Sequence, residues 1–168
     1  MNRSTDMDAC ADWHPEIERK FLLTAVPECL RGRACVEIEQ GWLSGGDEPI
    51  RLRRETSEDG ERWLRTEKRG RGAERIEREA EISSEQFEAL WPETAPRRVR
   101  KRRWRVNVGV LCWEIDEFHD RSLALAEVEL PAADTPLALP DWLAPHVVRE
   151  VTEEPEYLNV RLARPSPG

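Results

Sequence analysis

The feature that most constrains the fold of this chain is a strict alternation of charged and apolar residues that recurs along most of its length. In the stretch 16–22, Glu16, Glu18 and Lys20 fall on one face of an extended strand, and the apolar Ile17 and Phe21 fall on the other with the stem of Arg19. Side chains that share a face lie about 6.5–7 Å apart along a strand. Two carboxylates at that spacing are suited to a hard cation, and the lysine to an anion on that cation. For one such stretch alone, a strand with a solvated charged face is the simpler interpretation.

The alternation recurs often enough to predict about eight strands joined mostly by short turns, and therefore an antiparallel meander. The expected strands span residues 16–23, 34–43, 49–55, 62–69, 75–82, 97–108, 111–118 and 123–130. Turns are expected at 45–47, 57–60 and 70–72. One helix is expected after Ser83, which forms a capping-box signature with Gln86. A second helix is expected over residues 155–163.

The charges on these strands come in blocks of one sign. The acidic blocks are Glu16/Glu18, Glu77/Glu79/Glu81, Glu114/Asp116 and Glu127/Glu129, and the basic ones are Arg51/Arg53, Lys68 and Lys101/Arg103/Arg105. If the sheet closes with these side chains inward, the lumen suits a polyanion bridged by a divalent metal. The competing interpretation is a set of ion pairs inside a polar barrel. Buried pairs without a ligand are costly, because desolvation often exceeds the Coulombic gain.

Composition sets further bounds. The chain has 168 residues, enough for one domain with a real core, and a net charge of −8, which argues against binding duplex nucleic acid. Of 26 Lys and Arg residues only Lys20, Lys68 and Lys101 are lysines, and all three fall in alternating strands. Lysine offers a compact ammonium where arginine offers a planar fork, so these three positions favour a point charge.

Location and domain limits follow from the same composition. No apolar run reaches the ~20 residues that span a bilayer, so no membrane partner is expected. The four Cys form no CxxC pair and are interpreted as reduced thiols of a cytoplasmic protein. Residues 1–13 are expected to be a flexible leader, 14–163 a single domain and 164–168 a tail; the oligomeric state stays open.

The ordered series of motifs resembles the CYTH superfamily, also called triphosphate tunnel metalloenzymes. The series begins with Glu-x-Glu-x-Lys at residues 16–20 and Arg-x-Arg at 51–53, and continues with Lys68 and Lys-x-Arg at 101–103. It ends with Glu-x-Asp at 114–116, Glu-x-Glu at 127–129 and the tail Glu-Val-Thr at 150–152 before Tyr-Leu-Asn at 157–159. The resemblance covers roughly residues 15–163.

This resemblance implies a mainly β protein: a closed eight-stranded antiparallel β-barrel tunnel with added helices, including a C-terminal lid helix. It implies that Mg²⁺ or Mn²⁺ is held by Glu16, Glu18, Glu127 and Glu129. Phosphate oxygens would be bound by Lys20, Arg51, Arg53, Lys68, Arg75, Lys101 and Arg103. Lys20, Glu18, Asp116 and Glu129 would be catalytic, and Glu77, Glu79 and Glu114 further acidic residues of the tunnel.

One position in the series departs from the family pattern. The family usually shows Arg-x-Glu-x-Glu in the fifth strand, whereas this chain offers Glu77, Glu79 and Glu81 after Arg75. We favour Glu77 and Glu79 because Arg75 then supplies the arginine. His14, His119 and His146 are scattered and are interpreted as surface or structural residues.

The function that fits best is metal-dependent hydrolysis of a triphosphate, most simply inorganic tripolyphosphate, to pyrophosphate and phosphate. Phosphoryl transfer needs positioning, metal and cations rather than covalent help from the protein. The alternatives are a class IV adenylate cyclase that forms cyclic AMP from ATP, a thiamine or nucleoside triphosphatase, and a module that binds polyphosphate without turnover. Product analysis separates the first three, and metal-dependent turnover separates them from the fourth.

Overall fold

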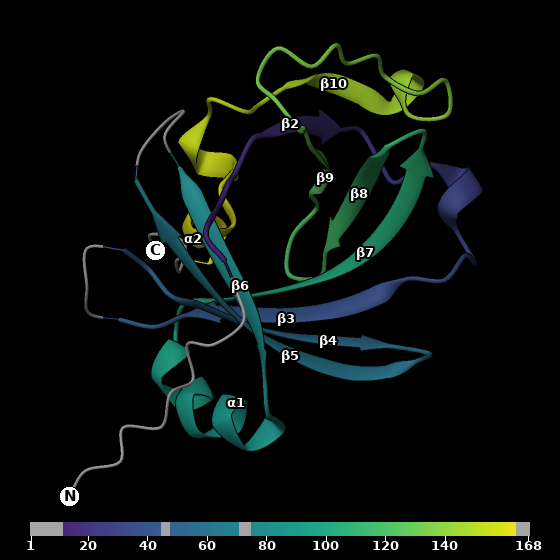
Figure 1. Ribbon diagram of the computed structural model, residues 1–168. Helices are drawn as coiled ribbons and strands as arrows, with labels where there is room; N and C mark the ends of the chain where they lie inside the picture. The colour runs from purple at the N-terminus through teal and green to yellow at the C-terminus, as the bar shows by residue number, and fades with distance from the viewer. Residues whose placement is uncertain (1–11, 45–47, 71–74, 164–168) are drawn as a thin grey trace, which may run out of the picture.

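The computed structural model describes residues 12–44, 48–70 and 75–163 as one curved, wholly antiparallel sheet with small helices packed against it (Figure 1). The sheet runs in the order β1-β6-β5-β4-β3-β7-β8-β9-β2-β10. Its strands are β1 (His14–Pro15), β2 (Glu18–Leu23), β3 (Val36–Trp42), β4 (Arg51–Ser57), β5 (Gly60–Arg69), β6 (Ile76–Ile82), β7 (Arg98–Val108), β8 (Leu111–Phe118), β9 (Ala124–Glu129) and β10 (Val147–Glu150). The helices are the 3₁₀ turns η1 (Glu28–Leu30), η3 (Trp91–Thr94), η4 (Ala144–His146) and η5 (Pro155–Tyr157), with α1 (Ser84–Leu90) and α2 (Asn159–Leu162).

The eight expected strands are present, with small shifts at their ends, but the closed eight-stranded barrel is not confirmed. The sheet has ten strands, and its terminal strands are β1 and β10. The segment 14–23 changes partner within its length, because β1 pairs with β6 and β2 pairs with β9. At the change, Glu16 N donates to Arg75 O at 3.0 Å, and Leu130 N donates to Ile17 O at 2.7 Å. One extended segment thus contacts both halves of the sheet (Figure 1).

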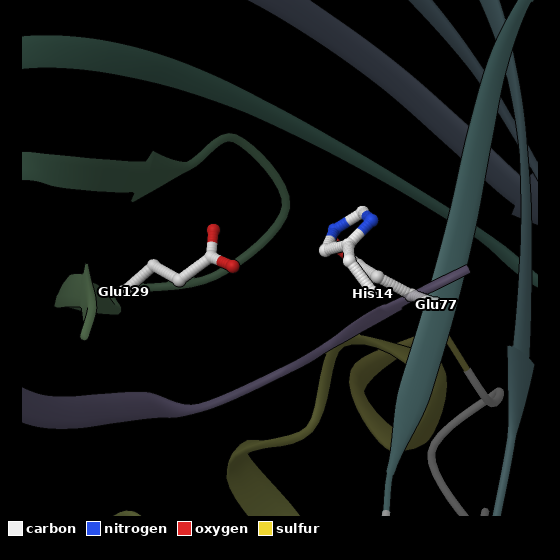
Figure 2. A group of neighbouring side chains, drawn as sticks. All are labelled: His14, Glu77 and Glu129. Atoms are coloured by element: carbon white, nitrogen blue, oxygen red, sulfur yellow. The ribbon is translucent and has the colours of Figure 1, made fainter. Parts of the chain in front are cut away.

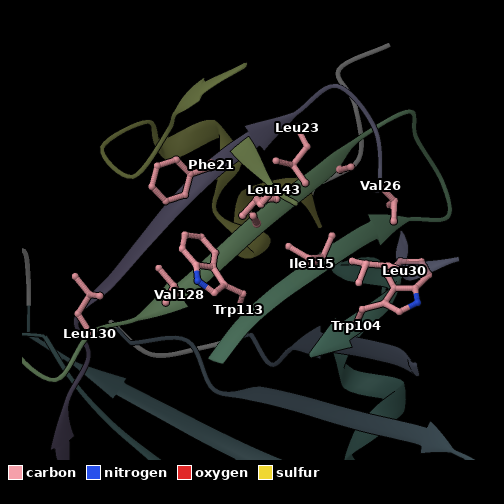
Figure 3. Close-up of a cluster of buried hydrophobic side chains, with 12 residues drawn as sticks. Phe21, Leu23, Val26, Leu30, Trp104, Trp113, Ile115, Val128, Leu130 and Leu143 are labelled. Carbon is pink, nitrogen blue, oxygen red and sulfur yellow. The ribbon is translucent and has the colours of Figure 1, made fainter. Parts of the chain in front are cut away.

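Apolar clusters cover the outer face of the sheet, as alternation requires. The largest buries Trp113, Ile115 and Val128 of β8 and β9 under Leu143 and the chain that leads to it (Figure 3). A smaller cluster joins Leu52 to Phe87 of α1. Most apolar side chains of the strands therefore point outward against these clusters, which leaves the opposite face for the charged residues and for a smaller apolar group that includes Leu64, Val99 and Leu125.

Helix α1 begins where the capping signature predicts. Gln86 N donates to Ser83 Oγ at 3.1 Å, and Ser83 N donates to Gln86 Oε1 at 2.8 Å, so both halves of the capping box form. The expected second helix over 155–163 is wrong in its extent. It is divided into η5 and α2 at Leu158, whose backbone is extended at φ −69° and ψ 132°.

The C-terminal segment closes one end of the charged face. Ala163 packs with Trp42, Val99 and Leu125, which belong to the ends of β3, β7 and β9. Strand β10 was not predicted; it adds to the outer edge of β2. The expected turns at 45–47 and 71–72, the leader as far as residue 11 and the tail 164–168 lie outside the described residues. No helix in the described part of the chain is long and apolar enough to cross a membrane.

Candidate active site

The inner face of the sheet surrounds a polar cavity of about 220 Å³. Its lining is Glu16, Glu18, Arg51, Arg53, Glu55, Arg62, Leu64, Lys68, Glu77, Glu79, Arg103, Arg105, Glu114, Glu127, Glu129 and Asn159. Among the described residues, eight carboxylates therefore face six cationic side chains. The two signs nearly balance, and the small excess is acidic.

Two further cavities adjoin the central one. A cavity of about 350 Å³ beside α2 shares Glu18, Arg51 and Lys68 with it and adds Lys20 and Arg75. A cavity of about 400 Å³ at the β4–β5 hairpin shares Glu55, Arg62, Arg103 and Arg105 with it. The shared lining places the three cavities one after another along the inner face of the sheet.

Glu18 and Glu129 form an acidic pair on this face. They are direct partners across β2 and β9. Neither side chain forms an ion pair or hydrogen bond with another described residue. Burial raises the pKa of Glu18 to about 7, and the nearby charge of Glu127 adds to the shift. Burial and the neighbouring Glu77 raise the pKa of Glu129 as well. Both carboxylates thus lack a direct ion pair, and the charges of Lys20 and Lys68 only partly offset the shift of Glu18.

Lys20 lies one step further along the same strand. Its Nζ is 3.2 Å from Glu127 Oε1, and it donates to the backbone carbonyl of Tyr157 at 3.1 Å. Lys20 is only 4% exposed. Burial alone would lower the pKa of Lys20, but Glu127 and Glu18 hold it above its usual value, so the ammonium stays charged. The C-terminal segment therefore helps to position this lysine.

Asp116 supports the basic wall rather than lining the cavity. Lys101 Nζ donates to Asp116 Oδ2 at 2.6 Å, and Arg103 donates to both carboxylate oxygens at 2.6 and 2.7 Å. Burial would raise the pKa of Asp116, but Arg103 and Lys101 keep it below its ordinary value. Lys101 also donates to Asn159 at 3.0 Å. Burial lowers the pKa of Lys101 to about 8 against the opposing effect of Asp116.

The opposite wall comes from β4, β5 and β6. Arg51 Nη2 donates to Thr66 Oγ1 and to Glu79 Oε2, each at 3.0 Å. Arg53 donates to Gln40 Oε1 at 3.2 Å, and burial together with the neighbouring Arg51 lowers the pKa of Arg53 to about 10. These two arginines come from alternate positions of β4, as the Arg-x-Arg spacing predicts.

Lys68 connects the two walls. Its ammonium pairs closely with Glu16 and lies 3.6 Å from Glu77. Arg75 Nη2 is 3.4 Å from Glu16 Oε2, an oxygen that is buried without a hydrogen-bond partner. Of the two glutamate pairs that the sequence left open, the structure places Glu77 and Glu79 on the cavity, whereas Glu81 has a 60% exposed side chain paired with Arg62.

Most of the residues expected from the sequence thus meet on one face. Lys20 and Arg75 line the neighbouring cavity, and Lys101 and Asp116 lie behind the central one, 1% and 0% exposed. Arg105 lines the cavity with the rest of its basic block, whereas sequence reasoning missed Glu55 and Arg62 as lining residues, although each shares the inner face of its strand. It also missed His14, which Figure 2 shows beside Glu77 and opposite Glu129. The sequence could have indicated this, because His14 is two residues before Glu16 and side chains at that spacing in a strand fall on the same face.

Comparisons with known proteins agree with this architecture. No family model matches the chain. The chain is 38% identical over 155 residues to an inorganic triphosphatase of Nitrosomonas europaea, a match that covers 88% of this chain and 96% of the relative. It is 30% identical over 158 residues to an inorganic triphosphatase of Acetivibrio thermocellus, covering 89% and 93%. A crystal structure of an inorganic triphosphatase superposes with a TM-score of 0.62 at 34% identity, covering 92% of this chain and 98% of the other.

A curved antiparallel sheet with carboxylates and cations on its concave face defines the class as a triphosphate tunnel fold of the CYTH type. The sequence identity to two inorganic triphosphatases, which extends over most of each chain, identifies the family within this class. The chain belongs to the inorganic triphosphatase family of the CYTH superfamily.

Proposed function

We propose that this protein hydrolyses inorganic tripolyphosphate to pyrophosphate and phosphate in the central cavity, with Mg²⁺ or Mn²⁺ as cofactor. The observation that carries the proposal is the unpaired Glu18–Glu129 couple within reach of a cationic wall. A triphosphate with its metal ion supplies both charges that such a site lacks: a cation for the carboxylates and an anion for the arginines and lysines.

The donor set fits a hard divalent cation. Glu18, Glu127 and Glu129 offer carboxylate oxygens, the ligands that Mg²⁺ and Mn²⁺ prefer. Glu127 Oε1 and Glu16 Oε2 are buried, and each has a cation nearby, Lys20 at 3.2 Å and Arg75 at 3.4 Å, without a hydrogen bond of good geometry. We assign Glu16, Glu18, Glu127 and Glu129 as the residues that would hold the ion. When bound, the ion would act as a Lewis acid that neutralises phosphate oxygens.

The cationic residues are assigned to the substrate. Arg51, Arg53 and Lys68 reach the central cavity from β4 and β5, and Arg103 reaches it from β7. Arginine can bind two phosphate oxygens at once through its planar fork, whereas Lys20 and Lys68 act as point charges. Asp116 holds Lys101 and Arg103 in place, so we assign it a positioning role instead of contact with substrate.

In the proposed reaction, one bond to the terminal phosphorus forms as another breaks. The oxygen of a water molecule attacks the terminal phosphorus, and the bond from that phosphorus to the bridging oxygen breaks. Pyrophosphate leaves, and the proton of the water passes to a carboxylate of the lining. The arginines and Lys20 stabilise negative charge as it moves onto the leaving group, which is where fixed cations contribute most to the rate.

The decisive experiment is phosphate release from tripolyphosphate, ATP and thiamine triphosphate with Mg²⁺, Mn²⁺ or EDTA, with cyclic AMP measured in parallel. We expect metal-dependent release from tripolyphosphate, lost in Glu18→Gln and in Glu129→Gln. Glu93→Gln, a change of an exposed glutamate in η3, is the matched control and should keep full activity. Full activity in the two site variants would overturn the assignment, and cyclic AMP from ATP would replace hydrolysis with cyclisation.

A cytoplasmic setting accords with this substrate. Cys29, Cys35 and Cys112 are free thiols, as expected in a reducing compartment.

A further inference from the structure

Three side chains from separate elements converge at the point where the segment 14–23 changes partner. His14 of β1 and Glu77 of β6 are direct cross-strand partners, and Glu129 is the last residue of β9. One ligand atom of each lies within 4.8 Å of the other two. Figure 2 shows the Glu129 carboxylate directed toward the imidazole from the opposite side.

The imidazole has a geometry that suits ligation. His14 Nε2 lies 3.3 Å from Glu77 Oε1, and Nδ1 lies 3.5 Å from the carbonyl oxygen of Asp12. When Nδ1 carries the proton it faces that carbonyl, and Nε2 keeps its lone pair toward the carboxylates. A backbone carbonyl behind one ring nitrogen is the usual arrangement that fixes the tautomer of a ligating histidine.

The two carboxylates of the trio differ in their ion pairs. Lys68 is 3.6 Å from Glu77 but pairs more closely with Glu16. Glu129 forms no ion pair with any residue in the described part of the chain. Both side chains belong to the lining of the central cavity, so a cation at this position would lie at its edge.

We propose that His14, Glu77 and Glu129 together bind a divalent transition-metal ion and that the imidazole makes this position discriminate against Mg²⁺. Carboxylates alone accept Mg²⁺ and Mn²⁺, whereas imidazole favours transition metals. The ion would also connect β6 to β9, which pair with β1 and β2, the two strands of the segment 14–23. The inference rests on the proposed function in one respect, because Glu129 is shared with the metal site assigned there.

Pulsed EPR of the Mn²⁺-loaded protein tests the proposal directly, because coupling of the ion to ¹⁴N reports an imidazole ligand. We expect ¹⁴N coupling in the wild type and its loss in His14→Ala, with Mn²⁺ and Co²⁺ affinity lowered on the order of 10–100-fold in titration calorimetry. Mg²⁺ affinity should change much less. His119→Ala removes an exposed histidine that pairs with Glu37 and is the matched control, so it should behave as the wild type.

The outcomes separate this proposal from the proposed hydrolysis. Wild-type protein without ¹⁴N coupling, or His14→Ala with unchanged coupling and affinity, would overturn the histidine ligand even if tripolyphosphate is hydrolysed. Coupling that depends on His14 would support the site even if the wild type releases no phosphate. A general loss of Mg²⁺ and Mn²⁺ binding in His14→Ala, with an altered circular dichroism spectrum, would show a structural role instead and would also count against it.

Discussion

Glu18 and Glu129 face each other across the β2–β9 ladder, and neither carboxylate has an ionic partner among the described residues. Like charges directly opposite in a sheet are destabilising, and burial increases the cost. In the metal-free state burial, together with the nearby charge of Glu127, raises the pKa of Glu18 to about 7 and so favours its protonated form. Proton and metal ion should therefore compete for the same oxygens.

The first prediction concerns pH and metal. A carboxyl whose folded pKa is raised from 4.5 to about 7 stabilises the folded state at low pH, and this contribution is lost as the pH rises through 7. The Tm of the EDTA-treated protein should fall across that window. The rise in Tm on adding Mg²⁺ should be larger at about pH 8 than at about pH 5.5, because fewer protons need to be displaced. Thermal unfolding with Glu18→Gln as control checks this; a Mg²⁺ shift independent of pH would contradict it.

The second prediction concerns Lys68, which lines both the central cavity and the one beside α2. Its side chain is 27% exposed, so Lys68→Ala should leave folding intact. We expect kcat/KM for tripolyphosphate to fall on the order of 100-fold, because a cation placed at a phosphate is lost. Arg100→Ala is the control, since Arg100 is 71% exposed and pairs with Glu39. Equal kinetics in the two variants would remove Lys68 from the substrate site.

The sequence predicted the inner face well because alternation is a local property. Whether Glu18, Arg53 or Glu127 points inward depends on the position of each within its own strand, and the strand pattern settles that. The pairing of the first strand with β9 is a long-range contact that no local pattern encodes. The same holds for β10, whose four residues do not alternate and which forms only against the edge of β2.

The places of Asp116 and His14 in the structure could not be predicted from the alternating pattern. Asp116 was expected to be catalytic, but it is fully buried and bonded to Lys101 and Arg103, a fact of packing that spacing cannot reveal. His14 lies at the expected boundary of the leader, so the sequence did not indicate that it belongs to a strand. Its place on the inner face follows only from the pairing of β1 with β6. The closed barrel is not confirmed, for the related reason that closure depends on the point at which segment 14–23 changes partner.

The third prediction concerns the C-terminal segment. Val160 of α2 lines the cavity that contains Lys20, Lys68 and Arg75. Val160→Asp adds a negative charge there and should raise KM for tripolyphosphate several-fold more than Val160→Asn, which makes a similar packing change without the charge. The difference should shrink at high ionic strength. Val148→Asp in β10 is a second control, because Val148 is 53% exposed. Indistinguishable KM values for the two Val160 variants would mean that substrate does not approach by this mouth.

The last prediction concerns Asp116. Asp116→Asn removes the negative charge that pairs with two buried cations, and breaking such a pair costs about 3–5 kcal/mol in the free energy of unfolding. The pKa of Asp116 is held below its ordinary value of 3.8, so the carboxylate stabilises the fold above that pH and loses this effect as the pH falls further. In denaturant unfolding, the wild type should therefore have a much larger free energy of unfolding than Asp116→Asn near neutral pH. This difference should become smaller as the pH falls into the acid range.

Asp120→Asn is the control, at a carboxylate that is 49% exposed, and should change the free energy of unfolding by less than about 0.5 kcal/mol. If Asp116→Asn unfolds at the same denaturant concentration as the wild type at neutral pH, Lys101 and Arg103 do not depend on this carboxylate, and its positioning role is wrong.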